Sequence, residues 1–162
     1  MIIRKATEAD VLAAAEIYED ARRFMRESGN PDQWSGEYPN EIDVREGIAK
    51  GTSYVCEDEG EVVATFHYES EADDPTYHSI YEGQWLSDLP YSVIHRIAVK
   101  HHGRGIIDFC FSECFKLFPN IRIDTHEANI PMQRALIRNG FRRCGIIYLE
   151  SGDKRIAFQK SE

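Results

Sequence analysis

The residues of this sequence with the clearest capacity to bind a ligand lie at a glycine-containing turn. The segment reads Val93-Ile94-His95-Arg96-Ile97-Ala98-Val99-Lys100-His101-His102-Gly103-Arg104-Gly105-Ile106, a predicted strand that leads into a predicted helix. Such a turn leaves backbone N–H groups unpaired at the positive end of a helix dipole, and glycine lets an anion approach the backbone. The pattern predicts a pyrophosphate site, and a purely structural tight turn is the alternative.

Two common phosphate-binding motifs are excluded at this turn. No Gly-Lys-Ser or Gly-Lys-Thr follows, so the turn is not a Walker loop. Only two glycines are present, and the strand does not open a β-α-β series, so the turn is not a dinucleotide fingerprint.

A second group of candidate binding residues is aromatic and lies in acidic segments. Two segments, 28–40 and 70–90, combine aromatic side chains with aspartate and glutamate. Aromatic rings beside carboxylates can hold an ammonium group through cation–π contact and charge. The alternative is that each ring anchors its long loop to the core. The candidate substrate-binding residues are Trp34, Tyr38, Tyr77 and Trp85.

The elements that must position these residues follow from hydrophobic periodicity and from turn residues. Strands are predicted at 2–5, 53–57, 62–68, 91–99, 121–125, 146–150 and 155–159. Helices are predicted from Thr7 to about Glu27, from Asn40 to Gly51, over 103–118, and from Asn129 to Asn139. The order β-α-α-β-β-β-α-β-α-β-β predicts an α/β (α+β) protein with a mixed sheet and helices on both faces.

Length and charge limit the class of protein. The 162 residues suit one domain, which we expect to span 1–162. Residues 1–90 carry 21 acidic and 7 basic residues, a net charge of −14, whereas residues 91–162 carry +5. An acidic whole argues against nucleic-acid binding. No apolar run approaches the ~18 residues of a membrane span, and the charged N-terminus does not fit a secretory signal, so we expect a cytoplasmic protein without a membrane partner.

The full pattern of elements and motifs resembles the Gcn5-related N-acetyltransferase (GNAT) superfamily. The family's acyl-CoA motif, Gln/Arg-x-x-Gly-x-Gly/Ala, aligns with the stretch from His102 to Ile107, with the central glycine at Gly105. His102 and Ile107 depart from that motif. Asn129, followed eleven residues later by Gly140-Phe141, matches the family's Asn…Gly-Phe signature. The resemblance covers about the full chain and implies an acyl-CoA N-acyltransferase fold with splayed central parallel strands.

The resemblance also implies where acetyl-CoA would bind. The strand 93–99 would diverge from the strand 121–125, and pantetheine would pair with backbone in the gap. The pyrophosphate would sit on the amides of the turn, and Asn129 would contact the pantetheine arm in addition to capping its helix. The implied cofactor-binding residues are Ile97, Val99, His102, Gly103, Arg104, Gly105, Ile106, Ile107 and Asn129.

The tyrosine that protonates the CoA thiolate in many family members is missing, because Leu136 stands at its position. His126 is one candidate replacement, since it directly follows the predicted strand 121–125 and the unperturbed pKa of a histidine side chain suits proton transfer near neutral pH. Cys144 is the second candidate, as a thiol donor. A loop hydrogen bond for His126 and a buried apolar role for Cys144 are the alternatives. The remaining candidates are His95, expected on the face opposite to Arg96, and Tyr148.

These observations predict an acyl-CoA-dependent N-acyltransferase that moves acetyl from acetyl-CoA to a primary amine of a cationic acceptor. The alternative is a CoA-binding module that has lost turnover. A metal hydrolase using Asp124 and His126 fits poorly because two ligands lack a third, and no metal is expected. A homodimer is compatible with the sequence, which does not identify the acceptor amine.

Overall fold

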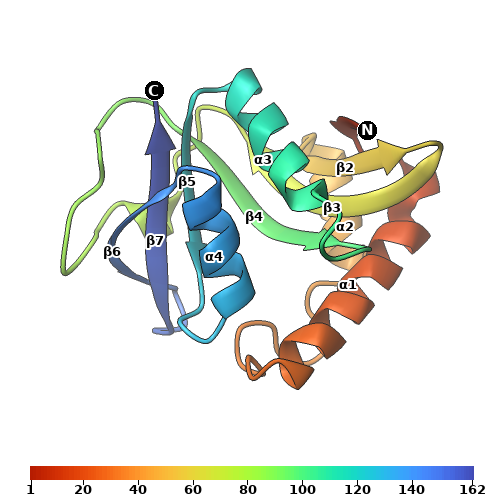
Figure 1. Ribbon diagram of the computed structural model, residues 1–162, viewed down its shortest axis with the longest axis horizontal. Helices are drawn as coiled ribbons and strands as arrows, with labels where there is room; N and C mark the ends of the chain where they lie inside the picture. The colour runs from red at the N-terminus through yellow and green to blue at the C-terminus, as the bar shows by residue number, and fades with distance from the viewer.

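Seven strands form one mixed sheet whose centre is split open (Figure 1). The computed structural model describes residues 1–162. The strands lie in the order β1-β2-β3-β4-β5-β7-β6, and every neighbouring pair is antiparallel except β4 and β5. They are β1 (Ile2–Lys5), β2 (Ser53–Asp58), β3 (Glu61–Glu69), β4 (Ser92–Val99), β5 (Asn120–Thr125), β6 (Arg142–Tyr148) and β7 (Lys154–Ser161).

Four α-helices cover the two faces of the sheet. They are α1 (Val11–Glu27), α2 (Glu41–Lys50), α3 (Ile106–Leu117) and α4 (Ile130–Arg138), with short 3₁₀ helices η1 (Glu8–Asp10) and η2 (Pro75–Tyr77). The apolar side chains of α1 and α2 form one buried cluster, and those of α3 and α4 belong to a larger cluster with the sheet. The predicted order of strands and helices is confirmed. None of the helices combines the length and apolar character needed to cross a bilayer.

The central strands β4 and β5 separate almost as soon as they start. Ser92 pairs with Ile121 and Val93 with Arg122, and no later residues of the two strands pair. Figure 1 shows β4 curving away from β5 toward α1. The β5-facing edge of β4 is therefore left without a strand partner from Ile94 onward, which confirms the predicted divergence.

A bulge at Arg96 changes the direction of β4. Arg96 has a φ of 55°, and the β3–β4 register shifts between Thr65 and His67. The Tyr18 hydroxyl on α1 donates a hydrogen bond to the Arg96 carbonyl oxygen at 2.8 Å. A bulge breaks the alternation of side chains along a strand, and both His95 and Arg96 line the same cavity. The expectation that they lie on opposite faces therefore needs correction.

Several element boundaries differ from the sequence prediction, among them the starts of α3 and β6. Helix α3 begins at Ile106, three residues later than predicted, because Gly103 and Gly105 both have a φ of 74° in the left-handed region. Strand β6 begins at Arg142, four residues earlier than predicted. A register shift between Arg143 and Gly145 interrupts the pairing of β6 with β7 and hides its alternating pattern.

Candidate active site

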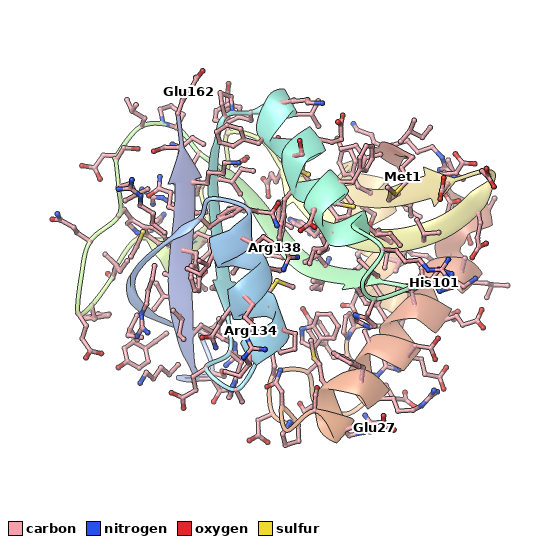
Figure 2. All side chains as sticks on the ribbon, in the orientation of Figure 1. Met1, Glu27, His101, Arg134, Arg138 and Glu162 are labelled. Carbon is pink, nitrogen blue, oxygen red and sulfur yellow. The ribbon has the colours of Figure 1, made fainter.

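A cleft of about 530 Å³ lies beside the free edge of β4. Residues from α1, the end of β4, the turn before α3, and the cleft side of α4 line it. Figure 2 shows His101 in that turn and Arg134 and Arg138 on α4. All three residues line the cleft, and the two arginines place positive charge along its rim.

The turn at the end of this cleft is built to receive an anion. The backbone amides of residues 102–107 donate to no acceptor within the chain, and they precede or begin the twelve-residue helix α3. A Cβ added at Gly103 or Gly105 would meet nothing within 4 Å, so both faces of the turn are open. The His102 ring stacks on Phe24 of α1, with centroids 4.3 Å apart, which fixes one side of the turn. Free amides at a helix N-terminus bind phosphate groups.

A second cavity, of about 300 Å³, adjoins the first at the point where β4 and β5 diverge. Four residues line both cavities: Met25, Ile97, Asn129 and Met132. None of these four side chains is ionisable. The two cavities therefore meet at a junction that contains no side-chain acid or base, whereas the body of the second cavity is rich in them.

A short polar contact in the second cavity joins Asp74 and His95. The Nε2 atom of His95 lies 2.7 Å from Oδ2 of Asp74, and Thr76 donates two hydrogen bonds to Oδ1 of the same carboxylate. Burial opposes the charge of Asp74, but the hydrogen bonds from His95 and Thr76 outweigh it and lower the pKa of Asp74 to about 2. Burial also opposes the charge of His95, yet Asp74 and Asp124 raise the pKa of His95 above its ordinary value.

Asp124 is a second carboxylate of this cavity and has no hydrogen-bond or ion-pair partner. Asp124 on β5 and His95 on β4 both line this cavity, where the two strands diverge, and they are close enough for the charge of Asp124 to act on His95. Burial raises the pKa of Asp124, although the nearby charges of His95 and Arg155 oppose this change. A third group, His67, is neutral near pH 7. Burial is the main cause, and together with the charge of His95 it lowers the pKa of His67 to about 4.

Gln33 lines the second cavity and connects the segment between α1 and α2 to the β5 side of the split sheet. Its side-chain oxygen accepts hydrogen bonds from Asn129 and Asn30, each at 2.8 Å. Its amide nitrogen donates to the Thr125 hydroxyl at 3.4 Å, and its backbone oxygen accepts from Arg155. The segment between α1 and α2 is thereby held against β5, α4 and β7.

The same architecture occurs in solved acetyltransferase structures. A GNAT-family acetyltransferase from Streptococcus agalactiae is 32% identical to this chain, with a TM-score of 0.91, and the match covers 99% of this chain and 95% of that one. The chain belongs to the GNAT family. Identity at this level over nearly the full length of both chains extends beyond likeness of fold. Membership supports acyltransferase activity in general and leaves the acceptor open.

More distant acetyltransferase structures share the fold alone. A GNAT-family acetyltransferase from Listeria monocytogenes is 23% identical, with a TM-score of 0.72, over 99% of this chain and 94% of its own. A ribosomal-protein-alanine N-acetyltransferase from Brucella melitensis is 20% identical, with a TM-score of 0.65, over the whole of both chains. No family model and no curated protein matches the sequence.

Most residues predicted from the GNAT motifs to bind CoA line the larger cleft. Asn129 also caps α4, since its side-chain oxygen accepts a hydrogen bond from the Met132 amide at 3.1 Å. Arg104 is exposed in the turn and does not line the cleft. The predicted residues that line it are Ile97, Val99, His102, Gly103, Gly105, Ile106, Ile107 and Asn129.

The two predicted proton donors, His126 and Cys144, line neither cavity. Nδ1 of His126 accepts a hydrogen bond from the Ala128 amide at 2.9 Å, which is the loop contact considered as its alternative. Cys144 is buried in β6, and its thiol contacts the Arg142 carbonyl oxygen at 3.4 Å. Burial raises the pKa of this thiol. Their catalytic roles remain predictions without support from the geometry.

The four candidate aromatic residues divide into two pairs. Trp34 and Tyr38 line the second cavity. Tyr77 and Trp85 line neither cavity and pack against each other, with ring centroids 5.3 Å apart. Trp85 also stacks on the Arg122 guanidinium at 4.2 Å, so this pair anchors the loop before β4 to the sheet. Tyr77 still contacts the site indirectly, because its ring packs 5.8 Å from that of His95.

The sequence does not reveal that Asp74, His95 and Asp124 form one group. Asp74 belongs to a long acidic loop with no periodic pattern, and its partner His95 is 21 residues away. The one available signal is the parallel pairing of β4 and β5, which places His95 and Asp124 at the same level of the sheet.

Proposed function

We propose that the protein transfers an acetyl group from acetyl-CoA to a primary amine. The observation that carries this proposal is the meeting of two cavities at the split between β4 and β5. One cavity ends at the free amides of the turn before α3, and the other contains His95, Asp74 and Asp124. An acyl donor and an amine held in the two cavities would meet at Ile97 and Met132.

The residues of the larger cleft fit a CoA molecule. The amides of residues 102–107 would hold the pyrophosphate, and the free edge of β4 would pair with pantetheine as an added strand. Arg134 forms no ion pair in the chain and would add positive charge at the phosphates, whereas Arg138 is already paired with Asp108 at 2.8 Å. Acetyl-CoA supplies the acyl group as a reactive thioester.

His95 is the residue best placed to deprotonate the amine. When Nε2–H donates to Asp74, Nδ1 carries the lone pair that accepts a proton, and Asp74 stabilises the imidazolium that results. Asp124 would hold the ammonium group before this transfer, since it has no competing partner in the chain. The raised pKa of His95 suits a base that works near neutral pH.

The remaining steps require few groups of the protein. The neutral amine nitrogen forms a bond with the carbonyl carbon, the carbon–sulfur bond breaks, and the sulfur keeps the electron pair. The ammonium group loses two protons in the whole reaction. The sulfur takes up one proton to form the CoA thiol, so one proton in total is released to solvent. Because none of the residues at the junction is ionisable, water would supply the proton to sulfur. Holding both reactants in adjoining cavities would provide much of the rate.

Release of the CoA thiol from acetyl-CoA across a panel of primary amines tests this function. We expect release to require both an amine and a folded turn before α3, and mass spectrometry to find an amide product. Binding of acetyl-CoA by calorimetry without thiol release on any amine would favour the alternative, a binding module without turnover. Absence of acetyl-CoA binding would overturn both.

A further inference from the structure

Arg96 in the second cavity has a guanidinium group without an anionic partner. It lines the cavity, forms no ion pair, and its Nε atom is buried with no hydrogen-bond acceptor. A buried donor without an acceptor is unfavourable, and for a charged group the penalty is larger. The Tyr18 hydroxyl holds the bulge at Arg96, and the charge of Arg96 acts on both His67 and His95: it adds to the effect of burial on the pKa of His67 and opposes the rise in the pKa of His95.

The distribution of charge in the cavity is balanced rather than acidic. Asp74 is paired with His95, which leaves Asp124 as the free carboxylate. Arg96 and Arg155 are the two guanidinium groups of the lining. Arg155 donates hydrogen bonds to the carbonyl oxygens of Lys154 and Gln33, so some of its donors are already occupied. Arg96 lies near Tyr38 and, at longer range, Asp43, but it forms no ion pair and its Nε atom has no acceptor. A simple amine would satisfy Asp124 and leave Arg96 unpaired.

On the basis of the proposed function, we propose that the acceptor is a small zwitterion of the amino-acid class, with an anionic group close to the reacting amine. Asp124 and His95 receive the amine, and Arg96 binds the carboxylate or an equivalent anion as the specificity-determining residue. Guanidinium groups bind carboxylates through paired, charge-assisted hydrogen bonds. A cavity of about 300 Å³ is at the small end of ligand sites and suits one amino acid better than a polyamine or an aminoglycoside.

Matched acceptors test this inference. Each amino acid of a panel is compared with its decarboxylated amine and with its carboxamide, for example phenylalanine, phenethylamine and phenylalanine amide. We expect kcat/KM to favour the acid form of the productive acceptor by at least about tenfold. Arg96→Gln should lower kcat/KM for the acid by about ten- to a hundredfold, mainly through KM, and lower that for the decarboxylated amine by a much smaller factor.

Arg143→Gln is the matched control, because Arg143 is exposed on β6 and forms no ion pair. If Arg96→Gln does not fold, Arg96→Lys is used instead, because it keeps the positive charge but lacks the planar guanidinium group. We then expect a smaller loss of kcat/KM, mainly for the acid form. The inference is overturned if the amine and amide react as well as the acid, or if the Arg96 variant slows all three equally.

A failure of the proposed function is recognised separately. If the chain binds acetyl-CoA but acetylates no acceptor, the same compounds are tested by thermal shift with acetyl-CoA present. Stabilisation by the acid forms alone, lost in the Arg96 variant, supports a zwitterion site without turnover. Equal or absent stabilisation by the three forms overturns it.

Discussion

His95 lies between two carboxylates that act on it in the same direction. Asp74 binds its Nε2 atom directly, and Asp124 faces it without a direct hydrogen bond. Both favour the protonated ring, and together they outweigh the burial that favours the neutral ring. A base must lose its proton before it can act, so we expect the acidic limb of kcat/KM to have its midpoint above the ordinary histidine value of about 6.5.

Asp74→Asn should move that limb to lower pH. The substitution removes a carboxylate that favours the charged ring, while the burial that favours the neutral ring remains. The plateau of kcat/KM at higher pH should also fall, because the His95 ring loses a hydrogen bond that orients it. The measurement is kcat/KM from about pH 5 to 9. Asp73→Asn is the control, since Asp73 is exposed and contacts His78 instead. A limb at the same pH in Asp74→Asn would exclude His95 as its origin.

His95→Gln and His126→Ala distinguish the two histidines proposed as proton carriers. His95→Gln should lower kcat by about 10²–10⁴, the usual contribution of general acid–base catalysis. His126→Ala should change kcat only a few-fold, because the ring lies outside both cavities. Loss of its hydrogen bond with the Ala128 amide should destabilise the fold by about 0.5–1.5 kcal/mol, or about 1–6 °C in Tm. The reverse ranking in kcat would restore His126 as the catalytic group.

At the residue scale, the sequence predicts local roles better than pairings. Asn129 is predicted to cap a helix, and it does, because a cap depends on residues within one turn. Asp74 and His95 meet through an irregular loop, and Arg96 enters the cavity through a bulge that no motif marks. Such placements depend on tertiary packing, which periodicity does not encode.

At the scale of elements, the turn before α3 determines whether CoA can bind. Gly105 is the N-cap of α3, with a φ of 74°, and a Cβ at this position would meet no atom within 4 Å. A side chain therefore fits the free turn but would occupy the space of a bound phosphate. Gly105→Glu should weaken acetyl-CoA binding by well over tenfold, measured by calorimetry, because its carboxylate repels the pyrophosphate. Backbone strain should add a modest loss of stability.

Gly152→Glu is the matched control for this change. Gly152 also has a positive φ, 92°, and open space around its Cβ position, but it lies in the turn between β6 and β7. It should suffer the same kind of strain and keep its acetyl-CoA affinity. Equal affinity in the two variants would show that the pyrophosphate binds elsewhere.

Elements with a strong local pattern can be placed from the sequence almost to the residue. Strand β1 matches its predicted range. Helix α2 also matches, because a capping Asn40 and a terminal Gly51 mark its two ends. Strand β6 could not be placed at its start, where two exposed arginines precede a bulge. Residues 81 and 84 in the loop before β4 bond to β6 as a short added edge, which no pattern in that loop indicates.

At the scale of the whole molecule, the split sheet needs a connection that does not fill the split. The β4–β5 ladder has only two residue pairs, so the segment around Gln33 provides a second link between the two halves. This link lies next to both cavities, because Asn129 lines each of them and Gln33 lines the second. The stability of the whole fold and the shape of the acceptor cavity should therefore depend on the same side chain.

Gln33→Ala tests that dependence. The variant leaves the side-chain N–H groups of Asn129 and Asn30 without their acceptor and removes the bond to Thr125. We expect a loss of about 1–3 kcal/mol in unfolding free energy, or about 2–12 °C in Tm, and a larger rise in KM for the acceptor than for acetyl-CoA. Gln84→Ala is the control, since that side chain is exposed and makes no hydrogen bond. If Gln33→Ala lowers Tm but raises both KM values equally, the link supports the fold without shaping the acceptor cavity.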